Sequence, residues 1–404
     1  MTAQRSIWTM VLACAVILAV TTGLRLSLGL FVQPLAQTGL GIATVSLVFA
    51  VGQFCWGATQ PLFGALSERI GTAQVLILGA VLLAGGLALA PILPGTWGLM
   101  LTLGILAAGG AGAGSFAILI GGTAQRIPFE KRAWAGGLIN AGGSIGQLVL
   151  APLTQAAITA AGWANALSLL AAIALGSAAL AVPAAGGARP AVAHQRAGRD
   201  SRLSTMMRTA FADRSYWLVH AAFFTCGFHI AFLATHLPGE VALCGLPEPA
   251  GARALSLIGL MNIAGTVGVG WLGGRFRFKG LLVALYASRA VAIIGYLMAP
   301  KTLLTVYVFA AVLGVSWLAT VPPTAGLVGK LFGTRHLATL FGLTLLSHQI
   351  GAFFGAWLGG VAMALSGSYL WVWYLDMGLA LLAAVANLPI RESSPTRAPV
   401  PAAA

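Results

Sequence analysis

Long apolar segments recur along the chain from one end to the other. A membrane-spanning helix needs about 20 consecutive apolar residues, and twelve segments are long enough to meet this requirement. Each segment is continuously apolar and does not alternate with polar residues, which excludes a membrane β-barrel and predicts α-helices. We therefore expect an all-α membrane protein with twelve transmembrane helices. The predicted spans are 8–34, 42–65, 74–94, 98–124, 134–160, 163–185, 215–239, 252–274, 280–300, 303–329, 336–362 and 369–390.

The composition supports this class and the charges indicate its orientation. Only 7% of the 404 residues are charged, whereas soluble domains carry about a quarter. With a cytoplasmic N-terminus, ten Lys and Arg fall in inner loops, six in the central loop and two in the tail, whereas the outer loops hold only Arg253 and Lys301. This positive-inside bias predicts that both termini are cytoplasmic. The net charge of +14 therefore reports topology in a lipid bilayer, and nucleic acid is not an expected partner.

One long polar segment divides the chain into two sets of six spans. Residues 186–214 are the predicted cytoplasmic central loop, whose second half has the composition of a short amphipathic helix. We expect residues 1–185 and 215–390 to form the N-terminal and C-terminal six-helix bundles. Residues 391–404 are rich in Pro and Ala and are expected to be a disordered cytoplasmic tail.

The two halves resemble each other at a nearly constant offset. The segment GLRLSLGLFVQP (23–34) aligns with GFHIAFLATHLP (227–238) at an offset of 204 residues, so Arg25 corresponds to His229. Two further segments align at offsets of 206 and 205 residues. This pattern indicates an internal duplication. Two duplicated six-helix halves predict pseudo-symmetric bundles and a transporter whose site lies between them near the middle of the membrane.

The loop between the second and third spans carries a recognisable signature. Its sequence GALSERIG (64–71) resembles the loop signature of the major facilitator superfamily, and GWLGGRFRFKG (270–280) resembles a second copy without an acid. The segment LSHQIGAFFGAWLGG (346–360), with the first and seventh spans, is similar to bacterial monocarboxylate transporters and oxalate/formate exchangers. The resemblance implies alternating access in a bacterial inner membrane and a small organic anion as substrate. It also implies an inner gate formed by Gly64, Glu68, Arg69 and Gly71, with Arg275 as the counterpart.

Arg25 is the first candidate for substrate binding because it lies within the first span. The first six spans contain no carboxylate that could neutralise it, and a mid-membrane arginine costs about 2.5–3.5 kcal/mol on insertion scales. Gln33 shares its helical face, and Gly29 between them leaves space beside the guanidinium. One interpretation is that Arg25 faces the cavity and binds a carboxylate substrate. The alternative is that it reaches the interface or binds backbone carbonyls.

Three histidines in the second half could couple transport to protons. His229, His236 and His348 lie in the seventh and eleventh spans, and histidine changes its charge near pH 6.5. A neutral histidine in a helix–helix hydrogen bond is an equally open interpretation for each of them.

Several other polar side chains lie within predicted spans. Arg289 in the ninth span and Asp376 in the twelfth lie at similar depth, and we predict a structural ion pair between them. The remaining residues are weaker candidates for lining the substrate cavity, and packing within the core is the alternative for each: Asn140, Gln147, Asn262 and Trp317.

These observations favour transport of a small organic anion. We do not expect an enzyme, because no metal, nucleophile or nucleotide motif is present. We expect a monomer without a cofactor that transports a monocarboxylate, with proton coupling as an open possibility. The alternative is an efflux pump for neutral or anionic drugs or metabolites. Cationic cargo is disfavoured because the first six spans lack a carboxylate.

Overall fold

The computed structural model describes residues 2–124, 127, 129–186, 200–333 and 337–392. The tail predicted to be disordered lies outside the described residues from 393 onward. Every regular element in the described ranges is helical, and no strand occurs there. This agrees with the predicted all-α class.

The first half contains the following helical elements. They are α1 (Thr2–Ser27), η1 (Leu28–Phe31), α2 (Val32–Leu35), η2 (Ala36–Leu40), α3 (Ile42–Ile70), α4 (Thr72–Leu89), α5 (Thr96–Leu99), η3 (Met100–Ala107), α6 (Ala108–Ala113), α7 (Phe116–Ala124), α8 (Phe129–Gly176), η4 (Ser177–Leu180) and α9 (Ala181–Ala185).

The amphipathic helix α10 precedes the second half, which is also helical. The elements are α10 (Asp200–Ala212), α11 (Arg214–Leu243), α12 (Pro249–Leu272), α13 (Phe278–Met298), α14 (Leu303–Ser316), α15 (Val321–Phe332), α16 (Leu337–Ser366) and α17 (Leu370–Asn387).

Eleven helices in the described residues are long and apolar enough to cross a membrane. One of them, Ala135–Ala185, has 51 residues, which at 1.5 Å per residue is about two and a half times the thickness of a bilayer core. It changes direction at Gly162, where φ is +79°, a backbone conformation that glycine adopts without a steric penalty. The helix therefore crosses twice, and the count agrees with the twelve predicted spans.

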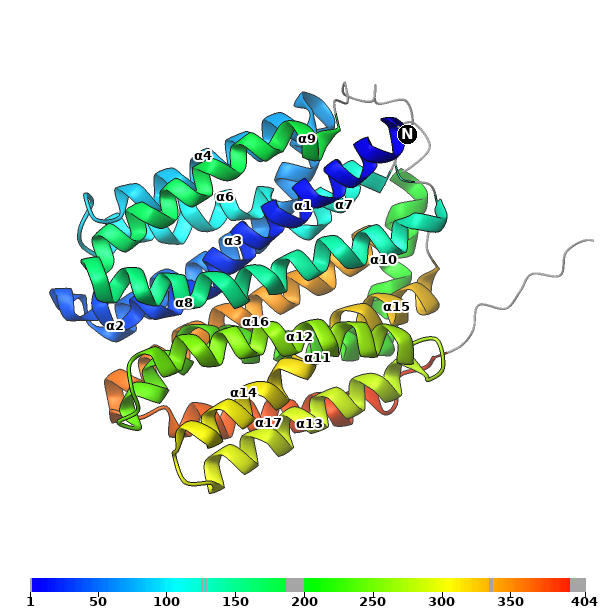
Figure 1. Cartoon of the computed structure of the whole chain (residues 1–404). Coiled ribbons are helices and arrows are strands. Elements are labelled where there is room, and N and C mark those ends of the chain that lie inside the picture. Colours follow the sequence, from blue (N-terminus) through cyan, green and yellow to red (C-terminus); the bar gives the residue numbers. More distant parts are fainter. Residues whose placement is uncertain (1, 125–126, 128, 187–199, 334–336, 393–404) are drawn as a thin grey trace, which may run out of the picture.

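The helices form two bundles that lie side by side (Figure 1). Helices α1–α9 make the first bundle, drawn from blue to green, and α11–α17 make the second, drawn from green to red. The apolar core of the second bundle continues across the interface through Leu26, Leu30 and Ala151 of the first. The start of α1 and the end of α17 lie at the same end of the molecule (Figure 1), which we call the terminal side; the opposite end is the far side.

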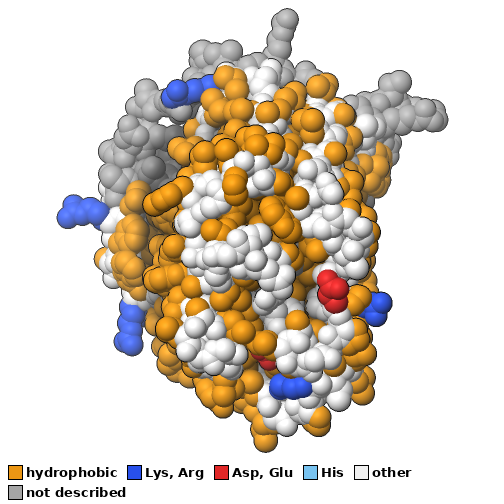
Figure 2. Space-filling view, turned by 90° about the vertical axis from the view of Figure 1, so that its left-hand side faces the viewer, with side chains coloured by type: hydrophobic (Ala, Val, Ile, Leu, Met, Phe, Trp, Pro, Cys, Tyr) orange, Lys and Arg blue, Asp and Glu red, His pale blue; other side chains and the backbone are white. Residues whose placement is uncertain are grey.

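Contacts between the bundles extend from the middle of the molecule to the far side. Gly29 packs against the backbone of Ala234 and Thr235 on α11. On the neighbouring pair of helices, Gly360 of α16 packs against Ser46 of α3. A side chain at either glycine would collide with the opposite bundle, so glycine permits this close approach. The far side is covered mainly by apolar and uncharged side chains (Figure 2).

Toward the terminal side, the glycines of the interface helices have no such neighbours. A Cβ atom at Gly64 of α3, Gly137 of α8, Gly268 of α12 or Gly342 of α16 would meet no heavy atom within 4 Å. The bundles are therefore packed together at the far side and less closely at the terminal side.

Candidate functional site

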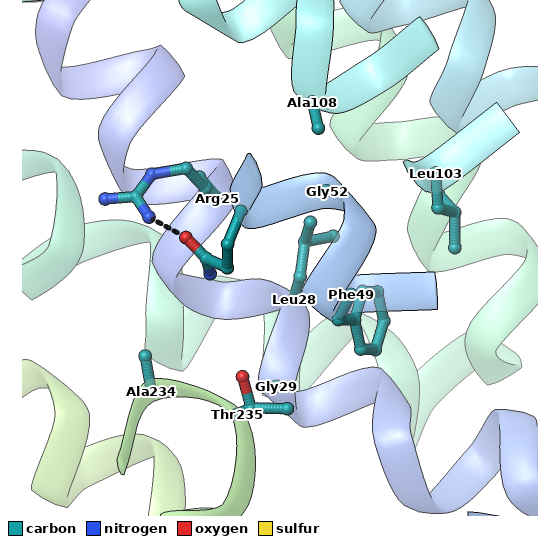
Figure 3. Close-up of a pocket in the computed structure, with 10 residues that line it drawn as sticks. Arg25, Leu28, Gly29, Phe49, Gly52, Leu103, Ala108, Ala234 and Thr235 are labelled. Carbon is teal, nitrogen blue, oxygen red and sulfur yellow. Dashed lines mark hydrogen bonds between the residues drawn. The ribbon is translucent and has the colours of Figure 1, made fainter. Parts of the chain in front are cut away.

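A small cavity lies between the two bundles beside Arg25. It measures about 20 Å³, which is room for about one water molecule. Figure 3 shows Arg25 and Leu28 of the first crossing beside Phe49 and Gly52 of α3. Ala234 and Thr235 of α11 approach the cavity from the opposite bundle. The full lining comprises Arg25, Leu28, Gly29, Phe49, Gly52, Gln53, Leu103, Ala108, Ala234 and Thr235.

Two side chains of α3 hold the guanidinium of Arg25. Its Nη1 donates a hydrogen bond to Oε1 of Gln53 at 2.6 Å, the dashed line in Figure 3. Its Cζ lies 4.2 Å from the ring centroid of Trp56, a cation–π distance. Gln53 and Trp56 are three residues apart and so lie on one face of their helix.

The guanidinium retains unused hydrogen-bonding capacity. Its Nε is buried and has no hydrogen-bond partner among the described residues. The ion pairs in the described part of the chain involve Asp376 and Glu392, both in the second half, so Arg25 has no carboxylate partner there. The edge formed by Nε–H and Nη2–H is the geometry that binds a carboxylate through two parallel hydrogen bonds.

His229 does not share the cavity with Arg25, although the two occupy equivalent positions in the halves. Its Nδ1 lies 2.6 Å from Oδ2 of Asp376, and both side chains are fully buried within the second bundle. The ring centroid of His229 lies 6.1 Å from that of Trp317. The helix α11 reaches the Arg25 cavity through Ala234 and Thr235 instead.

The predicted ion pair between Arg289 and Asp376 is wrong, because each residue has another partner among the described residues. Nη2 of Arg289 donates to the backbone carbonyls of Ser316 and Trp317, at 2.5 and 2.8 Å. Asp376 binds His229. These carbonyls are available because the helical hydrogen bonding is interrupted between α14 and α15, where the N–H of Val321 bonds to the carbonyl of Leu318 and not to that of Trp317.

Asn262 binds a backbone N–H group at this interruption and also contacts the first bundle. Its Oδ1 accepts from the backbone N–H of Leu318 at 2.9 Å, and its Nδ2 donates to Oγ of Ser144 in the first bundle at 2.8 Å. Asn262 therefore links the interrupted crossing to the other bundle. It does not line the Arg25 cavity.

The other predicted lining residues are also placed away from this cavity. Gln33 lies farther along the first crossing, close to Gly239 of the opposite bundle. Gln147 is buried and packs against Gly259, while Asn140 is partly buried on the same helix. Trp317 is fully buried, and its Nε1 has no partner among the described residues.

The two remaining histidines have different surroundings. His236 is buried, and its Nε2 lies 2.7 Å from the carbonyl oxygen of Ala356. A carbonyl can only accept, so Nε2 carries the proton in this helix–helix hydrogen bond. His348 is nearly buried, with Nδ1 lying 3.3 Å from Nε2 of Gln349. The hydrogen bond to the carbonyl of Ala356 favours a structural role for His236.

The predicted gate lies at the terminal side. Gly71 joins α3 to α4 with φ of +101°, which explains the glycine at this turn. Arg69 is exposed, and Arg275 lies over the ring of Trp271 in its own bundle, at 3.9 Å from the centroid. The side chain of Glu68 lies outside the described set. Gly64 has no contact with the other bundle, as described above.

Sequence reasoning missed Gln53, Trp56 and the pairing of Asp376 with His229. The spacing of Gln53 and Trp56 on the second span was a usable signal, because a polar and an aromatic side chain share one helical face there. The pairing had no local signal, since the two residues are 147 positions apart.

Comparison with known proteins agrees with this architecture. Residues 11–356 match the family model of the Major Facilitator Superfamily. The chain is similar to monocarboxylate transporter 13 of Rattus norvegicus, with 25% identity over 90% of this chain and 83% of the relative. It is also similar to the uncharacterized MFS-type transporter YcxA of Bacillus subtilis (strain 168), with 22% identity over 96% of both chains.

A solved structure has the same arrangement of helices. The crystal structure of a D-xylose-proton symporter matches with a TM-score of 0.78 and covers 96% of this chain and 98% of that one. The sequence identity is 14%, so the likeness shows a shared fold.

Proposed function

Because the chain belongs to the Major Facilitator Superfamily and is a transporter, not an enzyme, we propose that it carries a small organic anion. The proposed substrate is a monocarboxylate, and transport proceeds by alternating access of one site to the two sides of the membrane. The similarity to monocarboxylate transporter 13 supports this substrate class.

Arg25 is the observation that carries the proposal. It combines a positive charge, a position between the bundles and a buried Nε without a partner among the described residues. A substrate carboxylate would accept hydrogen bonds from Nε–H and Nη2–H, while Gln53 keeps its hydrogen bond to Nη1. Since an intramembrane ionisable residue marks a functional site by default, the anion is the partner that Arg25 lacks.

The transport cycle requires the cavity to change size. A space of about 20 Å³ holds about one water molecule, so the described state is closed around Arg25. The close packing at the far side and the uncrowded glycines at the terminal side favour opening of this state toward the terminal side. A substrate taken up from the far side would leave there as the walls from α3 and α11 separate.

Orientation and coupling complete the proposal. The bias of Lys and Arg toward the terminal side supports cytoplasmic termini in a bacterial inner membrane. Proton-coupled uptake is the proposed mode, with His229 as the group that changes charge. We expect the functional unit to be the monomer, since the cavity lies between the bundles of one chain.

The direct test is carboxylate binding by purified protein and its Arg25→Ala variant. We expect short monocarboxylates to raise the melting temperature of the unmodified protein. Arg25→Ala should weaken binding by at least tenfold, about 1.4 kcal/mol, because the charge and the two-bond geometry are both lost. Arg25→Lys should recover part of the affinity, since it restores the charge without the planar fork.

Arg253→Ala is the matched control, because Arg253 is an exposed arginine on α12. It should bind carboxylates like the unmodified protein. Equal binding by Arg25→Ala and Arg253→Ala would contradict the proposal.

A further inference from the structure

A histidine–carboxylate pair is buried inside the second bundle. Nδ1 of His229 lies 2.6 Å from Oδ2 of Asp376, and the side chains are 1% and 0% exposed. An ionised carboxylate only accepts, so Nδ1–H is the donor and Nε2 carries the free lone pair. Nε2 of His229 and Oδ1 of Asp376 lack hydrogen-bond partners among the described residues. Buried polar atoms without partners require an explanation.

The surroundings of this pair contain one fixed cation. Arg289 on α13 lies at the interruption of the tenth crossing, whose Trp317 is the neighbour of His229. Cys226 on α11 lies 3.2 Å from Oγ1 of Thr320, atom to atom. Cys226 lies about one turn before His229 on α11, and the ionisable groups that interact with Cys226 are Tyr286 and Arg289 on α13 and His348 on α16.

The charges of the buried groups suggest why a proton would accompany an anion. With His229 neutral, Asp376 balances Arg289, and the charge of Arg25 remains unbalanced. A bound carboxylate neutralises Arg25, and one proton on His229 adds a charge to the second bundle. The empty carrier and the carrier loaded with both therefore have the same total buried charge. Loading the proton alone would add an unbalanced positive charge to a low-dielectric interior, which is unfavourable, so protonation of His229 is expected to depend on the bound anion.

The interruption of the tenth crossing connects the pair to the first bundle. Arg289 binds the carbonyls at the end of α14, and Asn262 binds the N–H of Leu318 next to them. Asn262 also contacts Ser144 of the first bundle. A change at this interruption would therefore alter both the surroundings of His229 and a contact between the bundles. Interrupted helices commonly form coupling sites in transporters.

We propose that the His229–Asp376 pair is the proton-binding site, in which Nε2 of His229 accepts the proton and Asp376 acts as the positioning residue. The step forms one N–H bond with a proton from water, and the same bond breaks when the site opens to the other side. Asp376 fixes the ring orientation and stabilises the imidazolium. This inference rests on the proposed anion transport and adds its coupling site.

The first test uses the unmodified full-length protein in detergent. Carboxylate binding is measured by isothermal titration at about pH 7.5, above the ordinary pKa of histidine near 6.5, in two buffers of different ionisation enthalpy. The proposal predicts uptake of about one proton for each anion bound. Anion binding without proton uptake would overturn the proposal.

The second test uses variants in proteoliposomes that contain an entrapped pH dye. Asp376→Asn should bind carboxylate without taking up a proton and lose most anion-driven proton movement, and its uptake should no longer rise toward acidic pH. Asp376→Glu should restore part of the proton movement. His220→Gln is the control, since His220 lies on the same helix and binds Ser347; it should behave like the unmodified protein.

The outcomes separate this inference from the proposed function. If the unmodified protein binds no carboxylate, the proposed function fails. If it binds carboxylate and Asp376→Asn retains the normal pH profile and proton movement, only the coupling site is wrong. Melting curves of each variant check folding, and the titration of unmodified protein decides the matter if Asp376→Asn does not fold.

Discussion

The guanidinium of Arg25 illustrates how two neighbours can prepare a charged group for a ligand. Gln53 occupies one donor and Trp56 covers one face of the plane, so the direction of the group is fixed. Neither neighbour removes the positive charge. An arginine stabilised in this way stays available to an anion at a lower cost of ordering on binding.

A carboxylate introduced beside Arg25 should act as an internal competitor. We predict that Gln53→Glu forms an ion pair with Arg25 and lowers carboxylate affinity by at least tenfold, while the melting temperature of the empty protein stays level or rises. The measurement is a thermal-shift titration with a short monocarboxylate. Gln74→Glu on α4, where Gln74 is exposed, supplies the same charge away from the cavity. Undiminished binding by Gln53→Glu would mean that Arg25 is not the anion site.

At the level of elements, the last described residues hold the terminal side of the second bundle together. The carboxylate of Glu392 accepts from Nζ of Lys330 at 2.6 Å and from the backbone N–H groups of Phe278 and Lys279 at 3.0 and 3.1 Å. It therefore caps the N-terminus of α13, where a negative charge is favourable. Its side chain is only 3% exposed.

This cap makes part of the stability depend on pH. Burial alone would raise the pKa of Glu392, but the hydrogen bonds from Lys330, Phe278 and Lys279 outweigh it and lower the pKa. A lowered pKa in the folded state stabilises the protein above the unfolded value of about 4.3, and this stabilisation is lost as the pH falls through the folded value.

Glu392→Gln should consequently destabilise the protein at neutral pH by about 1.5–3 kcal/mol, the range for hydrogen bonds to a charged group. Melting curves in detergent at pH 7 and near pH 4 provide the measurement. The difference between variant and unmodified protein should shrink at the lower pH. A difference that is constant or grows on acidification would contradict the role of the charge.

The elements show what the sequence could predict. Apolar length was sufficient for the twelve crossings, because the bilayer itself sets the length of each helix. Depth and charge did not identify the partner of Arg289: similar depth suggested Asp376, but the interruption of the tenth crossing leaves backbone carbonyls that the arginine binds. Arg25 was found because a charge in an apolar segment is conspicuous. Gln53 and Asp376 required knowledge of which helices are neighbours.

At the scale of the whole molecule, hydrogen bonds as well as close glycine contacts join the two bundles. Besides the glycine contacts, Nε2 of Gln155 donates to Oε1 of Glu248 across the bundles at 2.9 Å, near the far side. Ser256 donates to the carbonyl of Leu148 at 2.7 Å on the same pair of helices. These contacts must break for the far side to open, while the terminal side closes. The Arg25 cavity lies between the two regions, where a transported ligand would be exposed to each side in turn.

The most direct measurement of the central claim is a crystal structure of the unmodified protein with a short carboxylate that carries a bromine atom. The anomalous signal of bromine locates the ligand without prior assumptions. We predict a ligand between the bundles whose carboxylate oxygens lie about 2.7–2.9 Å from Nε and Nη2 of Arg25. A ligand bound elsewhere, with Arg25 still held only by Gln53 and Trp56, would contradict the account.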